Sequence, residues 1–251
     1  MVKENVYWTK ETPEMIEAFK KAQETFRYFW RELYWESRRI VPALDFAFIK
    51  VAFHQKKLFY KEGITEFMWV RVLDFDGHTI TGVVDNKPQS INNIKLGAEI
   101  AIPLEEVCDW LFSNVRKAYG GFTIHVLRKE MGQEEREAHD QAWQIDFGDS
   151  NNILLVYEQF EKPENLIEHP MSVVMKESFI TYLEQHQDEL TSKNDKGYTM
   201  LHTEAVAGNL PMIEVLLEKG VDRYATTEYG DTALDLAKKM NWEHLIKVLE
   251  G

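Results

Sequence analysis

Hydrophobic residues recur at helical spacing near the start of the chain. A single apolar stripe, with a member every three or four positions, is formed by Met15, Phe19, Ala22, Phe26, Phe29 and Leu33. Thr12, Pro13 and Glu14 precede this stripe, and they suit an N-cap, a first helical position and a first turn. The pattern therefore predicts a helix that begins near residue 13 and ends before Pro42.

Beyond Pro42 the period of the pattern changes to two, which is typical of β-strands. Strands are expected over residues 46–53, 67–73, 79–84, 99–102, 122–127 and 152–157. A helix is expected to start at Pro103 and to carry Leu104, Val107, Trp110 and Leu111 on its apolar face. Short sequential strands with tight turns indicate a small, curled antiparallel sheet with flanking helices, so the predicted class of this part is α+β.

The C-terminal third contains an internal repeat. Residues 197–202, Gly-Tyr-Thr-Met-Leu-His, are matched by residues 230–235, Gly-Asp-Thr-Ala-Leu-Asp, at a spacing of 33 residues. Residues 209–222 resemble the second helix of an ankyrin repeat and the glycine that ends it. Residues 175–187 match the last helix of a degenerate first repeat. Residues 171–251 therefore resemble the ankyrin repeat family, which implies an all-α stack of one degenerate and two recognisable repeats.

The ankyrin resemblance also implies roles for single residues. Thr199 and Thr232 match the threonine that caps the first helix of a repeat, and His202 matches the histidine that bonds between neighbouring turns. Gly220 fits the left-handed residue at the end of the second helix. Because stacks of so few repeats are seldom stable alone, we expect the N-terminal part of the chain to supply a missing cap.

A second resemblance covers residues 12 to 130. The motifs that carry it are Glu-Phe-Met-Trp-Val at 66–70, Gly-Val-Val-Asp-Asn-Lys-Pro at 82–88, Leu-Gly at 96–97, Asp-Trp at 109–110 and Gly-Gly-Phe-Thr at 120–123. In this order they are similar to the YegJ-like family, a bacterial domain without a known function. The expected domains are a YegJ-like domain over residues 1–162 and the repeats over 171–251, with a proline-containing linker between them.

Composition and charge limit the classes of partner. The chain carries 42 acidic and 29 basic side chains, a net charge of −13, which disfavours binding to nucleic acid and to anionic membrane surfaces. Cys108 is the single cysteine, and no signal peptide or membrane-spanning apolar run is found in the sequence, so a cytoplasmic protein is expected. The eight histidines lack metal-ligand spacing, and Gly120-Gly121 precedes no phosphate-binding helix in this interpretation, so no metal or cofactor is expected.

The ankyrin family binds through its hairpin tips and the concave face of its first helices. The corresponding positions here are Asp195, Lys196, Tyr198, Glu204, Glu228, Tyr229 and Asp231. Exposed tyrosines beside acids suit a protein contact, because tyrosine buries a large area at a low cost in conformational entropy. A solvated rim without a binding role explains the same residues equally well.

Two hypotheses concern the N-terminal domain. Trp69, Asn86 and Trp110 could line a ligand groove, although both tryptophans lie in apolar stripes that favour a core position. Glu66, Asp85, Asp109 and His125 could act as acid and base in a hydrolytic or small-molecule-binding enzyme. The favoured function is nevertheless a non-enzymatic protein-interaction module, an adaptor or immunity-type protein that binds a basic protein.

Overall fold

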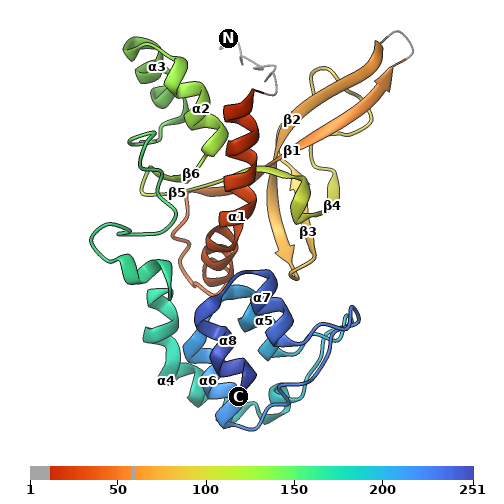
Figure 1. The fold of residues 1–251 in the computed structure, drawn as a ribbon, viewed down its shortest axis with the longest axis vertical. Coiled ribbons are helices and arrows are strands. Elements are labelled where there is room, and N and C mark those ends of the chain that lie inside the picture. Colours follow the sequence, from red (N-terminus) through yellow and green to blue (C-terminus); the bar gives the residue numbers. More distant parts are fainter. Residues whose placement is uncertain (1–11, 58–59) are drawn as a thin grey trace. The chain divides into compact units, whose positions relative to one another are not determined.

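The computed structural model describes residues 12–57 and 60–251 (Figure 1). In chain order the elements are α1 (Pro13–Glu36), β1 (Phe46–Lys57), β2 (Tyr60–Phe75), β3 (Thr79–Val84), β4 (Glu99–Pro103), η1 (Leu104–Glu106), β5 (Val107–Asn114), β6 (Lys117–Gly120), α2 (Phe122–Glu130), α3 (Gln133–Trp143), η2 (Pro163–Leu166), α4 (Pro170–Gln185), η3 (Gln187–Leu190), α5 (Met200–Ala207), α6 (Leu210–Glu218), α7 (Ala233–Lys239) and α8 (Glu243–Glu250).

The chain forms two compact units. Unit 1 ends at Phe26 and resumes over Val41–Leu154, and unit 2 takes Arg27–Ile40 and Leu155–Gly251. Helix α1 therefore contributes its first half to unit 1 and its last ten residues to unit 2. Its start is the predicted one, since the Met15 backbone N–H donates to Thr12 Oγ1 at 3.3 Å and Pro13 is the first helical residue.

Unit 1 is built on one antiparallel sheet of six strands in the order β4-β3-β2-β1-β5-β6. Helix α2 packs on β5 (Figure 1). One core cluster of unit 1, to which α2 contributes Ile124, contains Leu111, Ala118, Ile124, Ile145 and Phe147. Trp143 packs against this cluster. The predicted α+β class of the N-terminal part is thus confirmed.

Three predicted elements differ from the structure, and two of them have the opposite type of secondary structure. Residues 107–111 belong to strand β5, and only residues 104–106 form a short 3-10 turn. Seven successive residues of β5, Val107 to Ser113, are buried, so both faces of this strand are covered and the period of two is lost. The predicted strand at 122–127 is helix α2, and the predicted strand at 152–157 is irregular chain whose Leu154 carbonyl accepts from the Gly120 N–H at 2.8 Å.

The start of helix α2 is set by groups from another strand. Gly120 and Gly121 both have left-handed φ angles, +76° and +73°, and a Cβ atom on Gly120 would lie 2.3 Å from the Trp110 carbonyl oxygen. The Asp109 carboxylate on β5 then accepts hydrogen bonds from the backbone N–H groups of Phe122 and Thr123 at 2.9 and 2.8 Å. This cap comes from thirteen or fourteen residues upstream, so local sequence patterns do not reveal it.

Unit 2 contains the predicted stack. The pairs α5–α6 and α7–α8 pack side by side after helix α4, which matches the helix of the degenerate first repeat (Figure 1). Thr199 and His202 form a capping box at α5, and His202 Nε2 also lies 3.0 Å from the Ala225 carbonyl oxygen. Thr232 and Asp235 repeat the box at α7, and Gly220 is left-handed with a φ of +82°. The roles implied by the ankyrin resemblance are therefore confirmed.

The last turns of helix α1 contribute to the core of unit 2. The buried Arg31 donates to the carbonyl oxygens of Asn165 and Ile167 at 2.5 and 3.0 Å, and burial lowers the pKa of its guanidinium to about 10. Trp35 Nε1 donates to Asn209 Oδ1 at 3.0 Å, between helices α5 and α6. Unit 2 is thus a repeat stack completed by a segment from near the start of the chain.

Candidate functional site

Two loops of unit 2, here called the finger loops, span residues 191–199 and 220–232. They lie side by side, because the Glu228 N–H donates to the Lys196 carbonyl oxygen at 2.9 Å (Figure 1). Asn194 Oδ1 tightens the first loop by accepting from the backbone N–H groups of Lys196 and Tyr198 at 3.0 and 2.9 Å. The finger loops are therefore held in place by hydrogen bonds to their backbone.

Most of the predicted contact residues are at the surface of the finger loops. Asp195, Glu228 and Tyr229 are exposed, and Lys196 and Asp231 are partly buried. Tyr229 has 46% of its surface exposed, and Tyr224 in the same loop has 73%. Tyr224 was missed because it lies outside the repeated Gly-x-Thr motif, where the spacing argument gives no information.

The expected exposure of Tyr198 and Glu204 is wrong. Tyr198 is 4% exposed, and its ring lies edge-on to His202 with the centroids 5.7 Å apart. Glu204 is fully buried and accepts from Tyr34, Arg38 and Asn209 at 2.8, 2.7 and 2.7 Å. Because Tyr34 at the end of α1 and Arg38 just after it supply two of these donors, Glu204 faces a partner within its own unit.

The predicted groove residues hold the fold of unit 1. Trp110 is fully buried, stacks against Phe112 and donates from Nε1 to Thr25 Oγ1 at 3.1 Å. Trp69 is partly buried against Trp143, and its backbone N–H donates to Asn86 Oδ1 at 2.7 Å. Trp110 is therefore a core residue, and Asn86 anchors the loop that follows strand β3.

Two of the carboxylates proposed for catalysis, Glu66 and Asp109, accept hydrogen bonds from separate segments of the backbone. Glu66 is 4% exposed and accepts from the backbone N–H groups of Gln89, Ser90 and Ile91 at 2.8 to 3.2 Å. Asp109 holds the start of α2, whereas Asp85 is exposed after strand β3. Backbone donors thus occupy Glu66 and Asp109, which explains why these motif residues of the YegJ-like pattern need a carboxylate.

A buried polar cluster surrounds Asp109. Lys50 Nζ donates to Thr123 Oγ1 at 2.9 Å, and Thr123 Oγ1 in turn donates to Asp109 Oδ2 at 2.5 Å. Burial lowers the pKa of Lys50 and raises that of Asp109, while the opposite charges of the two groups counteract both shifts. Burial also raises the pKa of the Cys108 thiol to about 11, so the thiol stays protonated and unreactive at neutral pH.

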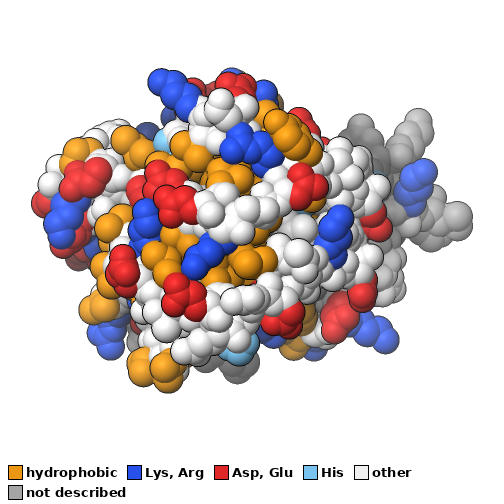
Figure 2. Space-filling view, turned by 90° about the horizontal axis from the view of Figure 1, so that it is seen from below, with side chains coloured by type: hydrophobic (Ala, Val, Ile, Leu, Met, Phe, Trp, Pro, Cys, Tyr) orange, Lys and Arg blue, Asp and Glu red, His pale blue; other side chains and the backbone are white. Residues whose placement is uncertain are grey.

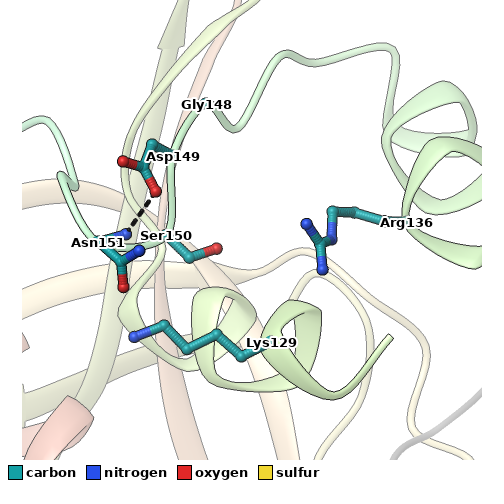
Figure 3. A pocket seen from close by; sticks show the side chains of 6 residues that line it. All are labelled: Lys129, Arg136, Gly148, Asp149, Ser150 and Asn151. Atoms are coloured by element: carbon teal, nitrogen blue, oxygen red, sulfur yellow. Dashed lines mark hydrogen bonds between the residues drawn. The ribbon is translucent and has the colours of Figure 1, made fainter. Parts of the chain in front are cut away.

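A polar pocket opens between α2, α3 and the loop after Phe147. Its volume is about 310 Å³, and it is lined by Lys129, Arg136, Gly148, Asp149, Ser150 and Asn151. Figure 3 shows the side chains of Lys129 and Arg136 reaching toward the loop from two helices, with the Ser150 hydroxyl between them. None of these residues was singled out from the sequence, because α2 and α3 were not predicted and their pairing with the loop could not be anticipated.

Behind the pocket, His125 Nδ1 lies 3.2 Å from Ser150 Oγ. His125 is 2% exposed, and burial, together with the charges of Arg128 and Lys129, lowers its pKa to about 4. The unfolded chain, with a histidine pKa near 6.5, then binds more protons than the folded one between pH 6.5 and 4. The fold therefore accommodates the neutral imidazole at pH 7. As the pH falls, the need to protonate His125 lowers the free energy of unfolding.

We expect the His125→Gln variant to lose part of the acid sensitivity of unit 1. Between pH 7 and pH 4.5 the free energy of unfolding of the wild type should fall by roughly 1–3 kcal/mol more than that of the variant. Urea titrations at both pH values, followed by far-ultraviolet circular dichroism, measure this difference. His54→Gln, which changes an exposed histidine of unit 1, is the control and should behave as the wild type.

Metal sites and membrane spans were also sought over the described residues. No group of three or more His, Cys, Asp or Glu side chains there is placed to hold a metal ion. None of the described helices combines the length and the apolar character that crossing a bilayer requires.

Known proteins match both parts of the chain. A family profile described as "Uncharacterized protein conserved in bacteria (DUF2314)" matches residues 12–147, and one described as "Ankyrin repeats (many copies)" matches residues 182–237. "Putative ankyrin repeat protein NMB1133/NMB1171" of Neisseria meningitidis serogroup B is 44% identical over 247 residues, 98% of this chain and 96% of that protein. "Uncharacterized protein YegJ" of Escherichia coli K12 is 32% identical over 75 residues, 30% of this chain and 49% of that protein. Both resemblances drawn from the sequence are confirmed.

Proposed function

Because this chain belongs to the DUF2314 family of bacterial proteins and carries ankyrin repeats near its end, we propose that it is a cytoplasmic protein-interaction module whose finger loops contact a protein partner. The observation that carries this proposal is the pair of exposed tyrosines, Tyr224 and Tyr229, on a loop that hydrogen bonds fix in place. Large aromatic side chains on a preformed surface contribute binding energy without a large ordering cost.

The charge of the chain favours a basic partner. Glu228 and Asp231 flank Tyr229, and the net charge of −13 attracts cationic surfaces over a distance of about 10 Å at moderate salt. On the face shown in Figure 2, apolar side chains are interspersed with acidic and basic ones, a mixture that suits a protein contact with a polar rim. We propose an adaptor or immunity-type role on these grounds.

For the buried carboxylates of unit 1 we propose a structural role rather than a role in hydrolysis. A general acid or base must reach a substrate proton, but Glu66 and Asp109 are buried and accept hydrogen bonds from backbone N–H groups. The two side chains line no part of the pocket beside α2 and α3. These contacts support a function in which the sheet presents surfaces and the carboxylates maintain its loops.

The double variant Tyr224→Ala/Tyr229→Ala is expected to lose its partner while keeping its fold. The affinity should fall at least tenfold, since each anchoring tyrosine contributes about 1–2 kcal/mol at a protein interface. The measurement is an affinity pull-down from native lysate at low salt with quantitative mass spectrometry, followed by calorimetry on the purified partner. Tyr182→Ala, which removes an exposed tyrosine of helix α4 in the same unit, is the matched control.

Two results would contradict this proposal. One is a partner that both variants retain equally, which would place the contact away from the finger loops. The other is a retained set of proteins that contains no basic member at low salt, which would remove the electrostatic argument.

A further inference from the structure

We propose that the pocket between α2, α3 and residues 148–151 binds the phosphate group of a small phosphate monoester. This inference concerns unit 1 and does not depend on the finger loops. The pocket brings together two cationic side chains, a hydroxyl and an amide: Lys129 on α2, Arg136 on α3, Ser150 and Asn151 (Figure 3). These groups are the donors that protein sites use for phosphate oxygens.

Neither cation of the pocket is held in an ion pair. Over the part of the chain that the structure describes, Lys129 and Arg136 form no ion pair with a carboxylate. Arg136 Nη2 donates to the Met131 carbonyl oxygen at 3.1 Å, and its Nε is buried without a hydrogen-bond partner. By contrast, the neighbouring Arg128 is paired with Asp140 at 2.6 Å and is only 3% exposed. In a chain with a net charge of −13, two cations that line one pocket without an ion pair indicate a place for an anion, although Asp149 lines the same pocket and interacts electrostatically with Lys129.

The loop on the other side of the pocket is preorganised. Asp149 Oδ1 accepts from the Asn151 N–H at 2.9 Å, and Asp149 Oδ2 accepts from Asn152 Nδ2 at 2.7 Å. His125 Nδ1, 3.2 Å from Ser150 Oγ, fixes the position of that hydroxyl. Asp149 therefore shapes the loop, although its negative charge also opposes an anion in the pocket.

The size and lining of the pocket favour a small ligand. Its volume of about 310 Å³ lies at the lower end of the range for small-molecule sites, roughly 300–1,000 Å³. The lining residues include no apolar side chain, so the site offers nothing to the hydrophobic residues that anchor a bound peptide. A dianion with three acceptor oxygens matches two cations from separate helices better than a carboxylate does.

Binding of glycerol 3-phosphate, inorganic phosphate and acetate to the full chain tests the proposal. The assays are isothermal titration calorimetry and backbone amide nuclear magnetic resonance. Glycerol 3-phosphate should shift the amide signals of residues 148–151 and bind more tightly than acetate. Lys129→Gln and Arg136→Gln should each weaken it about tenfold, and Asp149→Asn should strengthen it about threefold. Lys95→Gln, at an exposed lysine of unit 1, is the control and should change nothing.

Several outcomes would overturn the assignment. Equal affinity of all variants, or equal affinity for acetate and glycerol 3-phosphate, would mean that the anion binds without using this site. A phosphoserine peptide that binds more tightly than glycerol 3-phosphate, with the same dependence on Lys129 and Arg136, would replace the small molecule by a phosphorylated protein.

Discussion

Replacing Trp242 with alanine is expected to lower the free energy of unfolding of unit 2 by about 3–5 kcal/mol. Trp242 is 2% exposed, between helices α7 and α8, and its Nε1 donates to the Val206 carbonyl oxygen at 3.1 Å. Truncation would leave both a large cavity and a buried carbonyl oxygen without its donor.

The surroundings of Trp242 leave little room for relaxation. Its ring lies edge-on to Tyr28 with the centroids 5.7 Å apart, and the guanidinium carbon of Arg31 lies 5.0 Å from the ring centroid. A Cβ atom on Gly208 would come within 2.4 Å of the indole, so the backbone of the preceding repeat is in direct contact with it. Trp242 therefore links the last repeat, the previous repeat and helix α1, all within unit 2.

Urea unfolding of the full chain, followed by far-ultraviolet circular dichroism, measures this loss. Trp242→Phe should recover part of the stability, because it restores apolar volume but not the hydrogen bond to Val206. Tyr224→Ala, in the same unit but 73% exposed, should change the free energy of unfolding by less than about 0.5 kcal/mol. An equal midpoint for Trp242→Ala and Tyr224→Ala would show that the indole is not part of the cooperative core.

The elements that the sequence predicts correctly depend on local rules. The helix at residue 13 follows from a cap and an apolar stripe within one segment, and the repeats follow from a fixed spacing of 33 residues. Strands β1, β2, β3 and β4 overlap the segments predicted from alternation, and most of the predicted contact residues are at the surface of the finger loops.

The errors involve partners that are distant in sequence. Residues 122–130 form a helix because the Asp109 carboxylate caps it, and β5 is buried on both faces, so neither segment keeps its expected period. Glu204 is buried because Arg38, 166 residues earlier, provides its counter-charge. The polar pocket was missed for the same reason, since it depends on two helices and a loop that meet only in the folded chain.

The isolated fragment 171–251 is expected to show no cooperative unfolding transition, although it contains all the recognisable repeat sequence. Without residues 27–40, Trp242 would lose Tyr28 and Arg31, and the fully buried Glu204 would lose Tyr34 and Arg38. Removing the partners of a buried carboxylate costs about 3–5 kcal/mol, which is a large share of the stability of a small domain.

Adding the missing part of α1 as a separate peptide distinguishes two reasons for the failure to fold. Either the fragment lacks α1, or it has too few repeats. A synthetic peptide of residues 27–40, mixed with fragment 155–251, should restore helical circular dichroism and a sigmoidal melting curve. The peptide with Arg31→Ala and Trp35→Ala should fail, because it cannot donate to the carbonyl oxygens of Asn165 and Ile167 or to Asn209 Oδ1. A cooperative transition of fragment 171–251 alone would refute the dependence on α1. If the dependence holds, residues 27–40 are a structural part of unit 2, and the stack folds only when this segment is present, in the same chain or as a separate peptide.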